Sequence, residues 1–207
     1  MCEVYEECCK WVKEQIEWGA GNVLASYLHS EGKSKVAFDN GKSVRFRRDS
    51  QWKYTLRKIE DDIDKIAWRA GAAATTRSGN CEEHADLTFY WLLTNTKGLK
   101  LNYCCGEDHA YIAIGNPKDL ENCIVVDPWP FKFRVGKYGD VRCQECKSFE
   151  VSGIISGFKV DYYKGLFQTA VKQCPLPEPL AKDIDEVDDY KYEAKQLLKS
   201  GDLYEVN

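Results

Sequence analysis

Three short β-like runs within residues 99–127 constrain the fold of this chain more than any other feature. The runs are LKLNYCC (99–105), HAYIAIG (109–115) and CIVVD (123–127). The short polar segments 106–108 and 116–118 separate them, and links of this length join antiparallel neighbours rather than parallel strands. A helical pattern over 81–96 comes directly before the first run. The chain is therefore predicted to be α+β, with an antiparallel sheet packed on the helix that starts at Cys81.

Weaker patterns predict further elements around this core. Apolar spacing predicts helices over 3–18, 50–70 (with Ser50 as N-cap) and 188–200. Alternating runs predict strands at 132–135 and 158–163, and a hairpin over 35–47 around Asn40-Gly41. Residues 70–80 are small and polar and contain two glycines, which is typical of a loop.

Length and composition favour one folded domain of ordinary size. At 207 residues and 43% hydrophobic residues, the chain can bury one core. We assign residues 1–175 to a single domain and residues 176–207 to an acidic tail with a terminal helix. A net charge of −4 argues against a nucleic-acid partner, which usually requires a basic stripe.

The sequence carries no sign of a membrane span or a cleavable export signal. It has no run of 18 apolar residues. Glu3, Glu6 and Glu7 stand where a signal peptide needs a basic start and an apolar run. We therefore expect the protein in the cytoplasm of the cell that makes it. A specialised secretion system that needs no such signal could still deliver it into a target cell.

The chain contains ten cysteines, which without an export signal favour reduced thiols over a disulfide framework. Cys143 and Cys146 form one C-x-x-C pair. A structural zinc site needs a second pair, and the adjacent Cys104 and Cys105 chelate poorly. We therefore expect no metal, and a local disulfide or two thiols at 143 and 146.

Cys81 differs from the other cysteines because it opens the predicted helix over 81–96. A helix start presents unpaired N–H groups and a partial positive charge, which favour a thiolate. Gly79 lets the chain turn sharply just before it. The backbone N–H of Cys81 could then donate to the oxyanion of a tetrahedral intermediate.

A thiol nucleophile also needs a base, and the chain has only three histidines. His109 opens one predicted strand and Asp127 closes the next, so antiparallel pairing would bring the two together. The carboxylate could then orient the imidazole, as the third member of a triad does. His84, three residues after Cys81, is the rival base, although a capping or packing role suits it better. His29 is expected on the surface.

The stretches RSGNCEEHADLTFYWLL, DHAYIAIG and IVVDPW resemble the core of the papain-like and transglutaminase-like cysteine enzymes. The resemblance covers about residues 72–131. It implies that Cys81 is the nucleophile, His109 the general acid and base and Asp127 the orienter, with no metal or cofactor. It further implies acyl transfer on a protein substrate. Compact members that act as bacterial effectors or toxins deamidate protein glutamine or asparagine, and an immunity or inhibitor protein is a candidate partner.

The sequence departs from the papain pattern near the nucleophile. Residue 75 is threonine where papain-like proteases carry a glutamine oxyanion donor. Thr75, Thr76, Ser78 or Asn80 could supply that donor instead, and we assign Ser78 and Asn80 to substrate binding. Trp129 is expected to form a cleft wall, whereas Trp91 is expected in the core. Glu82 and Glu83 must point away from the thiol, because nearby acids oppose a thiolate.

Two alternatives to a deamidase stay open. The same triad serves cysteine proteases and transglutaminases, and cleft shape, which a sequence does not show, divides these reactions. A non-catalytic interaction module could also retain this fold and use the acidic segment 183–189 to dock a basic partner.

Overall fold

The computed structural model is α+β, as predicted, with helices packed on an antiparallel sheet. It describes residues 2–21, 23–30, 32–34, 59–106, 109–116, 118–130, 133–137, 145–150 and 157–173. The helices are α1 (Cys2–Gln15), α2 (Leu24–His29), α4 (Asp62–Thr76), α5 (Cys81–Asn95) and α6 (Gly157–Gln173). The strands are β1 (Lys100–Cys105), β2 (Ala110–Ile114), β3 (Ile124–Asp127), β4 (Arg134–Lys137) and β5 (Glu145–Glu150).

The sheet has the strand order β4-β3-β2-β1-β5, and every neighbouring pair is antiparallel. The three predicted runs within 99–127 are confirmed as β1, β2 and β3. The strand predicted at 132–135 is β4, shifted towards the C-terminus. No prediction covered β5, which returns beside β1. In the centre of the sheet Ile112 of β2 faces Val126 of β3, and this register sets where the site residues at the strand ends fall.

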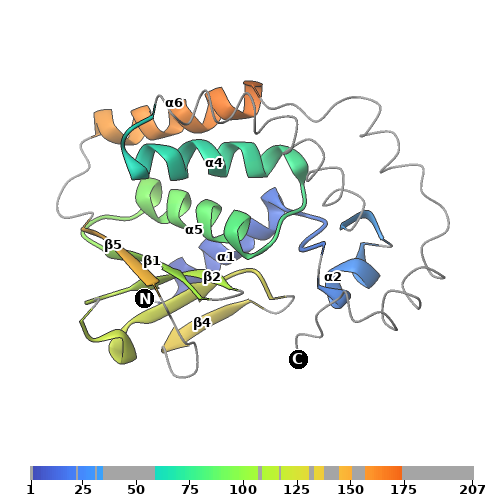
Figure 1. Cartoon of the computed structure of the whole chain (residues 1–207), viewed down its shortest axis with the longest axis horizontal. Coiled ribbons are helices and arrows are strands. Elements are labelled where there is room, and N and C mark those ends of the chain that lie inside the picture. Colours follow the sequence, from blue (N-terminus) through green and yellow to red (C-terminus); the bar gives the residue numbers. More distant parts are fainter. Residues whose placement is uncertain are drawn as a thin grey trace.

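Helix α5 is the centre of the molecule, with the sheet on one side and α4 and α6 stacked on the other (Figure 1). Helix α1 runs alongside α5 and also contacts β3 and β4. Every residue from Glu83 to Leu93 is buried. A helix enclosed in this way is apolar around most of its circumference instead of along one stripe. The prediction that Trp91 belongs to the core is confirmed.

The buried carboxylate of Asp86 on α5 is paired with residues of neighbouring elements. Arg69 of α4 donates to both carboxylate oxygens of Asp86, at 2.8 and 2.6 Å. The hydroxyl of Tyr103 on β1 donates to the same carboxylate at 3.1 Å. The Asp86 carboxylate thus joins α4, α5 and the sheet. Removing one partner of such a pair lowers stability strongly, because the other charge is then left buried without compensation.

The loop predicted over 70–80 and the strand predicted at 158–163 are wrong, because windows this short contain too few residues to establish a period. Residues 71–76 belong to α4, since alanine favours helix and small side chains let α6 approach closely. A Cβ on Gly71 would lie 2.2 Å from the Phe167 carbonyl oxygen. The helix begins at Asp62, with Asp61 as N-cap, and residues 59–61 lie outside it. The strand predicted at 158–163 is part of α6.

Some predictions fall outside the described residues: the hairpin over 35–47, Ser50, Cys143, and the tail over 176–207 with its helix. Among the helices that are described, none combines the length and apolar character needed to cross a bilayer.

Candidate active site

Cys81 is the first residue of α5, and the backbone around it is tightly specified. Asn80 precedes the helix in extended conformation, and its N–H donates to the Glu83 carboxylate at 2.9 Å. Glu83 is thereby turned to the helix start, and Glu82 is exposed. Gly79 leaves no room for a side chain, since a Cβ there would lie 2.6 Å from Cβ of Glu83. The glycine predicted to permit a close approach therefore does so.

The segment before the nucleophile is fastened to the end of α1. The N–H of Trp18 donates to the Arg77 carbonyl at 3.0 Å, and the N–H of Gly79 donates to the Gly19 carbonyl at 3.2 Å. The Ser78 hydroxyl is buried within 2.9 Å of the Gly19 carbonyl and 2.8 Å of the Ser34 carbonyl. Ser78, predicted to bind substrate, thus has its hydroxyl engaged in holding this segment.

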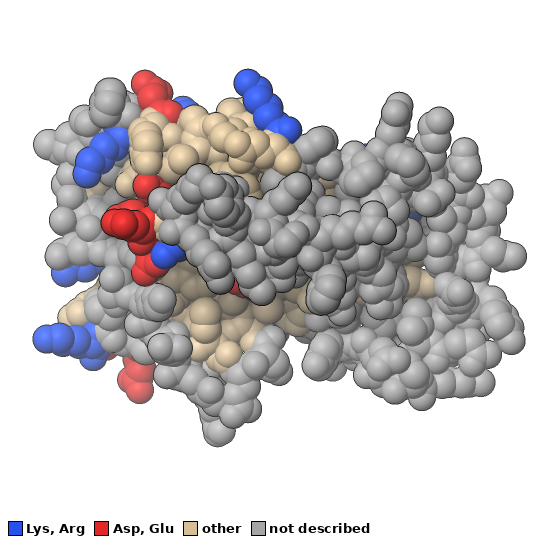
Figure 2. Space-filling view, turned by 45° about the horizontal axis from the view of Figure 1, so that its top comes forward, with Lys and Arg blue, Asp and Glu red and all other residues tan. Residues whose placement is uncertain are grey.

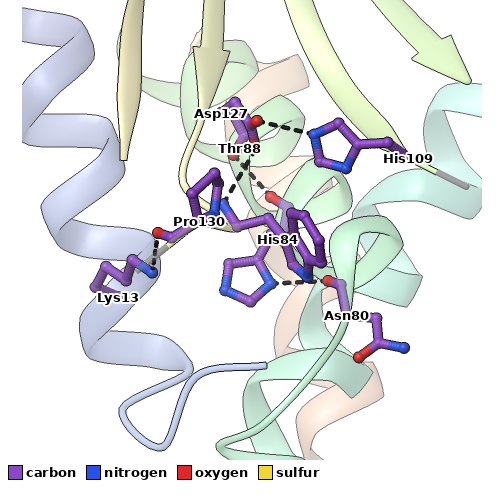
Figure 3. Close-up of polar contacts among 8 residues, drawn as sticks. Lys13, Asn80, His84, Thr88, His109, Asp127 and Pro130 are labelled. Atoms are coloured by element: carbon purple, nitrogen blue, oxygen red, sulfur yellow. Dashed lines mark hydrogen bonds and ion pairs between the residues drawn. The ribbon is translucent and has the colours of Figure 1, made fainter. Parts of the chain in front are cut away.

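His109 and Asp127 meet at the ends of β2 and β3. Nε2 of His109 lies 2.8 Å from Oδ2 of Asp127, and Figure 3 shows the two side chains turned toward each other. The Asp127 carboxylate is 2% exposed and the imidazole 18% exposed. An ionised carboxylate only accepts, so Nε2 carries the proton. In the neutral ring this leaves the lone pair on Nδ1, which makes Nδ1 the nitrogen that can act as a base.

The Cys81 thiol acts on the same imidazole. Burial alone would lower the pKa of His109, but the hydrogen bond that the ring donates to Asp127, its hydrogen bond with Cys81 and the charges of both residues outweigh burial and raise the pKa from 6.5 to about 9. Nδ1 is buried and lacks a hydrogen bond of standard geometry. Because Nε2 faces Asp127, Nδ1 is the nitrogen left to serve the sulfur. The structure thus brings Cys81, His109 and Asp127 together.

Trp129 lies against this group. Its ring centroid is 4.8 Å from that of His109, with the planes tilted by 44°. Its backbone N–H donates to Oδ1 of Asp127 at 3.2 Å. The carboxylate therefore accepts from His109 with one oxygen and from the Trp129 backbone with the other. The predicted place of Trp129 beside the site agrees with this contact.

Sequence reasoning missed Lys13, which approaches the site from α1. Its Nζ donates to the Pro130 carbonyl at 2.8 Å, as Figure 3 shows. Burial lowers the pKa of Lys13 to about 8, and the negative charge of Asp127 opposes that effect. A partly buried cation thus stands behind the carboxylate and holds the segment that carries Trp129. Lys13 looked like any solvated lysine of a helix, so no local pattern could have singled it out.

His84, the rival base, is fully buried, and Nδ1 lies 2.7 Å from the Asn80 carbonyl oxygen. Burial and the charge of Lys13 lower the pKa of His84 to about 3, against the Asn80 hydrogen bond. A ring that stays neutral, with one nitrogen on a backbone carbonyl, does not serve the thiol.

The hydroxyls proposed as oxyanion donors are already engaged. Thr75 donates to the Ala72 carbonyl at 2.7 Å. The Thr76 hydroxyl lies 2.8 Å from the Ala73 carbonyl oxygen and 2.6 Å from that of Ser78. With Ser78 also engaged, Asn80 is the one of the four proposed side chains that stays a candidate beside the Cys81 N–H.

Among the described residues, the other cysteines form no second candidate for a catalytic or metal site. Six described cysteines are thiols outside any disulfide: Cys8, Cys9, Cys81, Cys104, Cys105 and Cys123. In the described ranges no three ligand-type side chains gather in a way that could hold a metal ion. On the face in Figure 2 the described lysines and arginines lie apart from one another, several of them beside acidic residues.

Comparison with known proteins returned no match to a family model, to a characterised protein or to a solved structure. What supports a function for this chain is therefore the geometry around Cys81, together with the resemblance of residues 72–131.

Proposed function

We propose that this protein is a thiol acyl-transfer enzyme with Cys81 as nucleophile, His109 as general acid and base and Asp127 as orienter, on a papain-like or transglutaminase-like core. The observation that carries the proposal is the 2.8 Å contact between His109 and Asp127, with the Cys81 thiol raising the pKa of the same ring. A thiol at a helix start, an imidazole and a carboxylate at two strand ends lie close together. A cysteine buried only for packing would need neither of the other two groups.

The first half of the reaction follows from the charges. With a pKa of about 9, His109 is protonated at neutral pH, and a protonated imidazole beside a thiol favours the thiolate. The sulfur attacks the amide carbon, and the carbonyl oxygen becomes an oxyanion facing the helix start. His109 then gives a proton from Nδ1 to the leaving nitrogen. The C–N bond breaks and a thioester remains on Cys81.

The second half returns the enzyme to its starting state. Neutral His109 takes a proton from water, which attacks the thioester carbon. The C–S bond breaks, which restores the Cys81 thiolate beside the protonated His109, and the carboxylic acid product gives its proton to the released ammonia and leaves as a carboxylate. For a glutamine or asparagine side chain the sum is amide plus water to carboxylate plus ammonium. We favour this deamidation, in a bacterial effector or toxin, on the resemblance of residues 72–131; proteolysis and transamidation use the same steps.

The enzyme class is tested with a small acyl donor and a thiol alkylator. Wild-type protein should hydrolyse p-nitrophenyl acetate, and Cys81→Ala should lose that activity while keeping its circular dichroism spectrum. Cys105→Ala removes an exposed thiol at the end of β1, where Cys105 pairs with Ala110, and should leave the rate unchanged because this thiol has no part in the proposed triad. If iodoacetamide labels Cys81 no faster than Cys105 at neutral pH, a non-catalytic interaction module becomes the better explanation.

The reaction type is tested with a glutamine-rich protein such as casein. Cys81-dependent release of ammonia without chain cleavage supports deamidation. New N-termini would show a protease, and incorporation of an added primary amine would show a transglutaminase.

A further inference from the structure

We propose that His84 is a positioning residue that orients the backbone N–H of Cys81 as the oxyanion donor. The inference rests on the proposed function and adds a part to it. His84 lies on α5, three residues after the nucleophile. Figure 3 shows its ring turned to the carbonyl of Asn80.

The contact acts on the peptide that joins Asn80 to Cys81. The Asn80 carbonyl oxygen accepts from the backbone N–H of His84 at 3.1 Å and lies 2.7 Å from Nδ1 of the same residue. No described peptide bond is cis. In a trans peptide the C=O and the N–H point in opposite directions. Holding the carbonyl toward the helix interior therefore aims the Cys81 N–H out of the helix start.

The contact with Nδ1 of His84 is a second hydrogen bond to the Asn80 carbonyl oxygen, and a buried carbonyl requires only one. The backbone N–H of His84 already satisfies the Asn80 oxygen, as in any helix. The neutral ring must carry its proton on Nδ1, because a carbonyl only accepts, and Nε2 is then buried without a partner. An unpaired buried acceptor lowers stability, and an apolar side chain would avoid that cost. A second donor on this oxygen restricts the tilt of the peptide plane, and that restriction is what an oxyanion donor requires.

Two reactions of the Cys81 sulfur distinguish a role in orienting the oxyanion donor from a general role in supporting the thiol or the fold. Alkylation by iodoacetamide displaces iodide at carbon and forms no oxyanion. Acylation by p-nitrophenyl acetate passes through a tetrahedral oxyanion before p-nitrophenolate leaves. A residue that orients the donor should affect the second reaction and spare the first. Losing one donor lowers rates by roughly 100- to 1000-fold, so misaligning it should lower the ester rate by roughly 10- to 100-fold.

The experiment compares His84→Leu with His84→Asn in the full chain. Asparagine keeps an N–H on the atom that corresponds to Nδ1, whereas leucine keeps the shape and loses the donor. The inference predicts a 10- to 100-fold loss of kcat/KM for the ester in the leucine variant, near-wild-type rates in the asparagine variant, and equal alkylation rates in all three proteins. If the leucine variant does not fold, His84→Ala, which only removes atoms, takes its place.

Other outcomes overturn the inference. Ester and alkylation rates that fall together would mean that His84 supports the thiol or the fold in general. An unchanged ester rate without the Nδ1 donor would mean that the peptide needs no second anchor. Failure of the proposed function has a different signature, since Cys81→Ala would then hydrolyse the ester as fast as wild type, and the role of His84 would fall with it.

Discussion

Replacing Asp127 with asparagine probes the electrostatics of the site most directly. Asparagine keeps the size of the side chain and an oxygen that can accept from Nε2, but it removes the charge. The pKa of His109 is raised from 6.5 to about 9, with burial opposing and Asp127 and Cys81 raising it. The difference of about 2.5 pH units corresponds to about 3 kcal/mol. In Asp127→Asn burial is opposed mainly by Cys81, so the pKa should fall to about 6.5 or below.

Nuclear magnetic resonance can follow this change, because the chain has only three histidines. The ring Cε1–H signal of His109 should titrate near pH 9 in wild type and near or below pH 6.5 in Asp127→Asn. Variants of His29 and His84 assign the three signals. A midpoint that stays the same in the two proteins would refute the assignment of Asp127 as the group that holds the imidazolium.

The same shift predicts how stability depends on pH. The folded state binds the His109 proton more tightly than the unfolded state does, so the stabilisation is complete below pH 6.5 and is lost as pH rises towards 9. Between pH 6.5 and 7.5, below the midpoint near pH 8 at which Lys13 titrates, wild type should lose about 1 kcal/mol of unfolding free energy. Urea unfolding should show this slope in wild type and a flat profile in Asp127→Asn.

Three further predictions concern the packing around the site. Gly71→Ala should destabilise the protein by about 1–3 kcal/mol in urea, because the new Cβ meets the backbone of α6; Gly165→Ala, which meets nothing within 4 Å, should stabilise it by about 0.5–1 kcal/mol. Asp86→Asn should cost ~3 kcal/mol by leaving Arg69 without its charge partner, and a double change of both residues to leucine and methionine should cost less. In wild type, deprotonation of Lys13 should increase the unfolding free energy as pH rises from 8 to 10.5. Lys13→Met should lack this increase, which the difference between the urea unfolding free energies of the two proteins at each pH measures.

The sequence alone determined the elements that depend on local pattern. The helix predicted over 81–96 from its apolar spacing is α5, which ends at Asn95, and three runs separated by short turns fold as β1, β2 and β3. Because short links make neighbouring strands antiparallel, the start of one strand and the end of the next were expected to meet. That expectation names His109 and Asp127, which lie 2.8 Å apart.

Tertiary structure decided whatever depends on what lies across the molecule. The alanine-rich end of α4 is helical because α6 packs on it at Gly71, and the window 70–80 that was predicted as a loop does not contain that partner. Lys13 becomes a partly buried cation behind Asp127 only because α1 is packed against the segment after β3. His84 becomes neutral because α5 is enclosed on all sides. Local sequence sets backbone preference, whereas burial and distant charges set the protonation of a side chain, and these exist only once the layers have assembled.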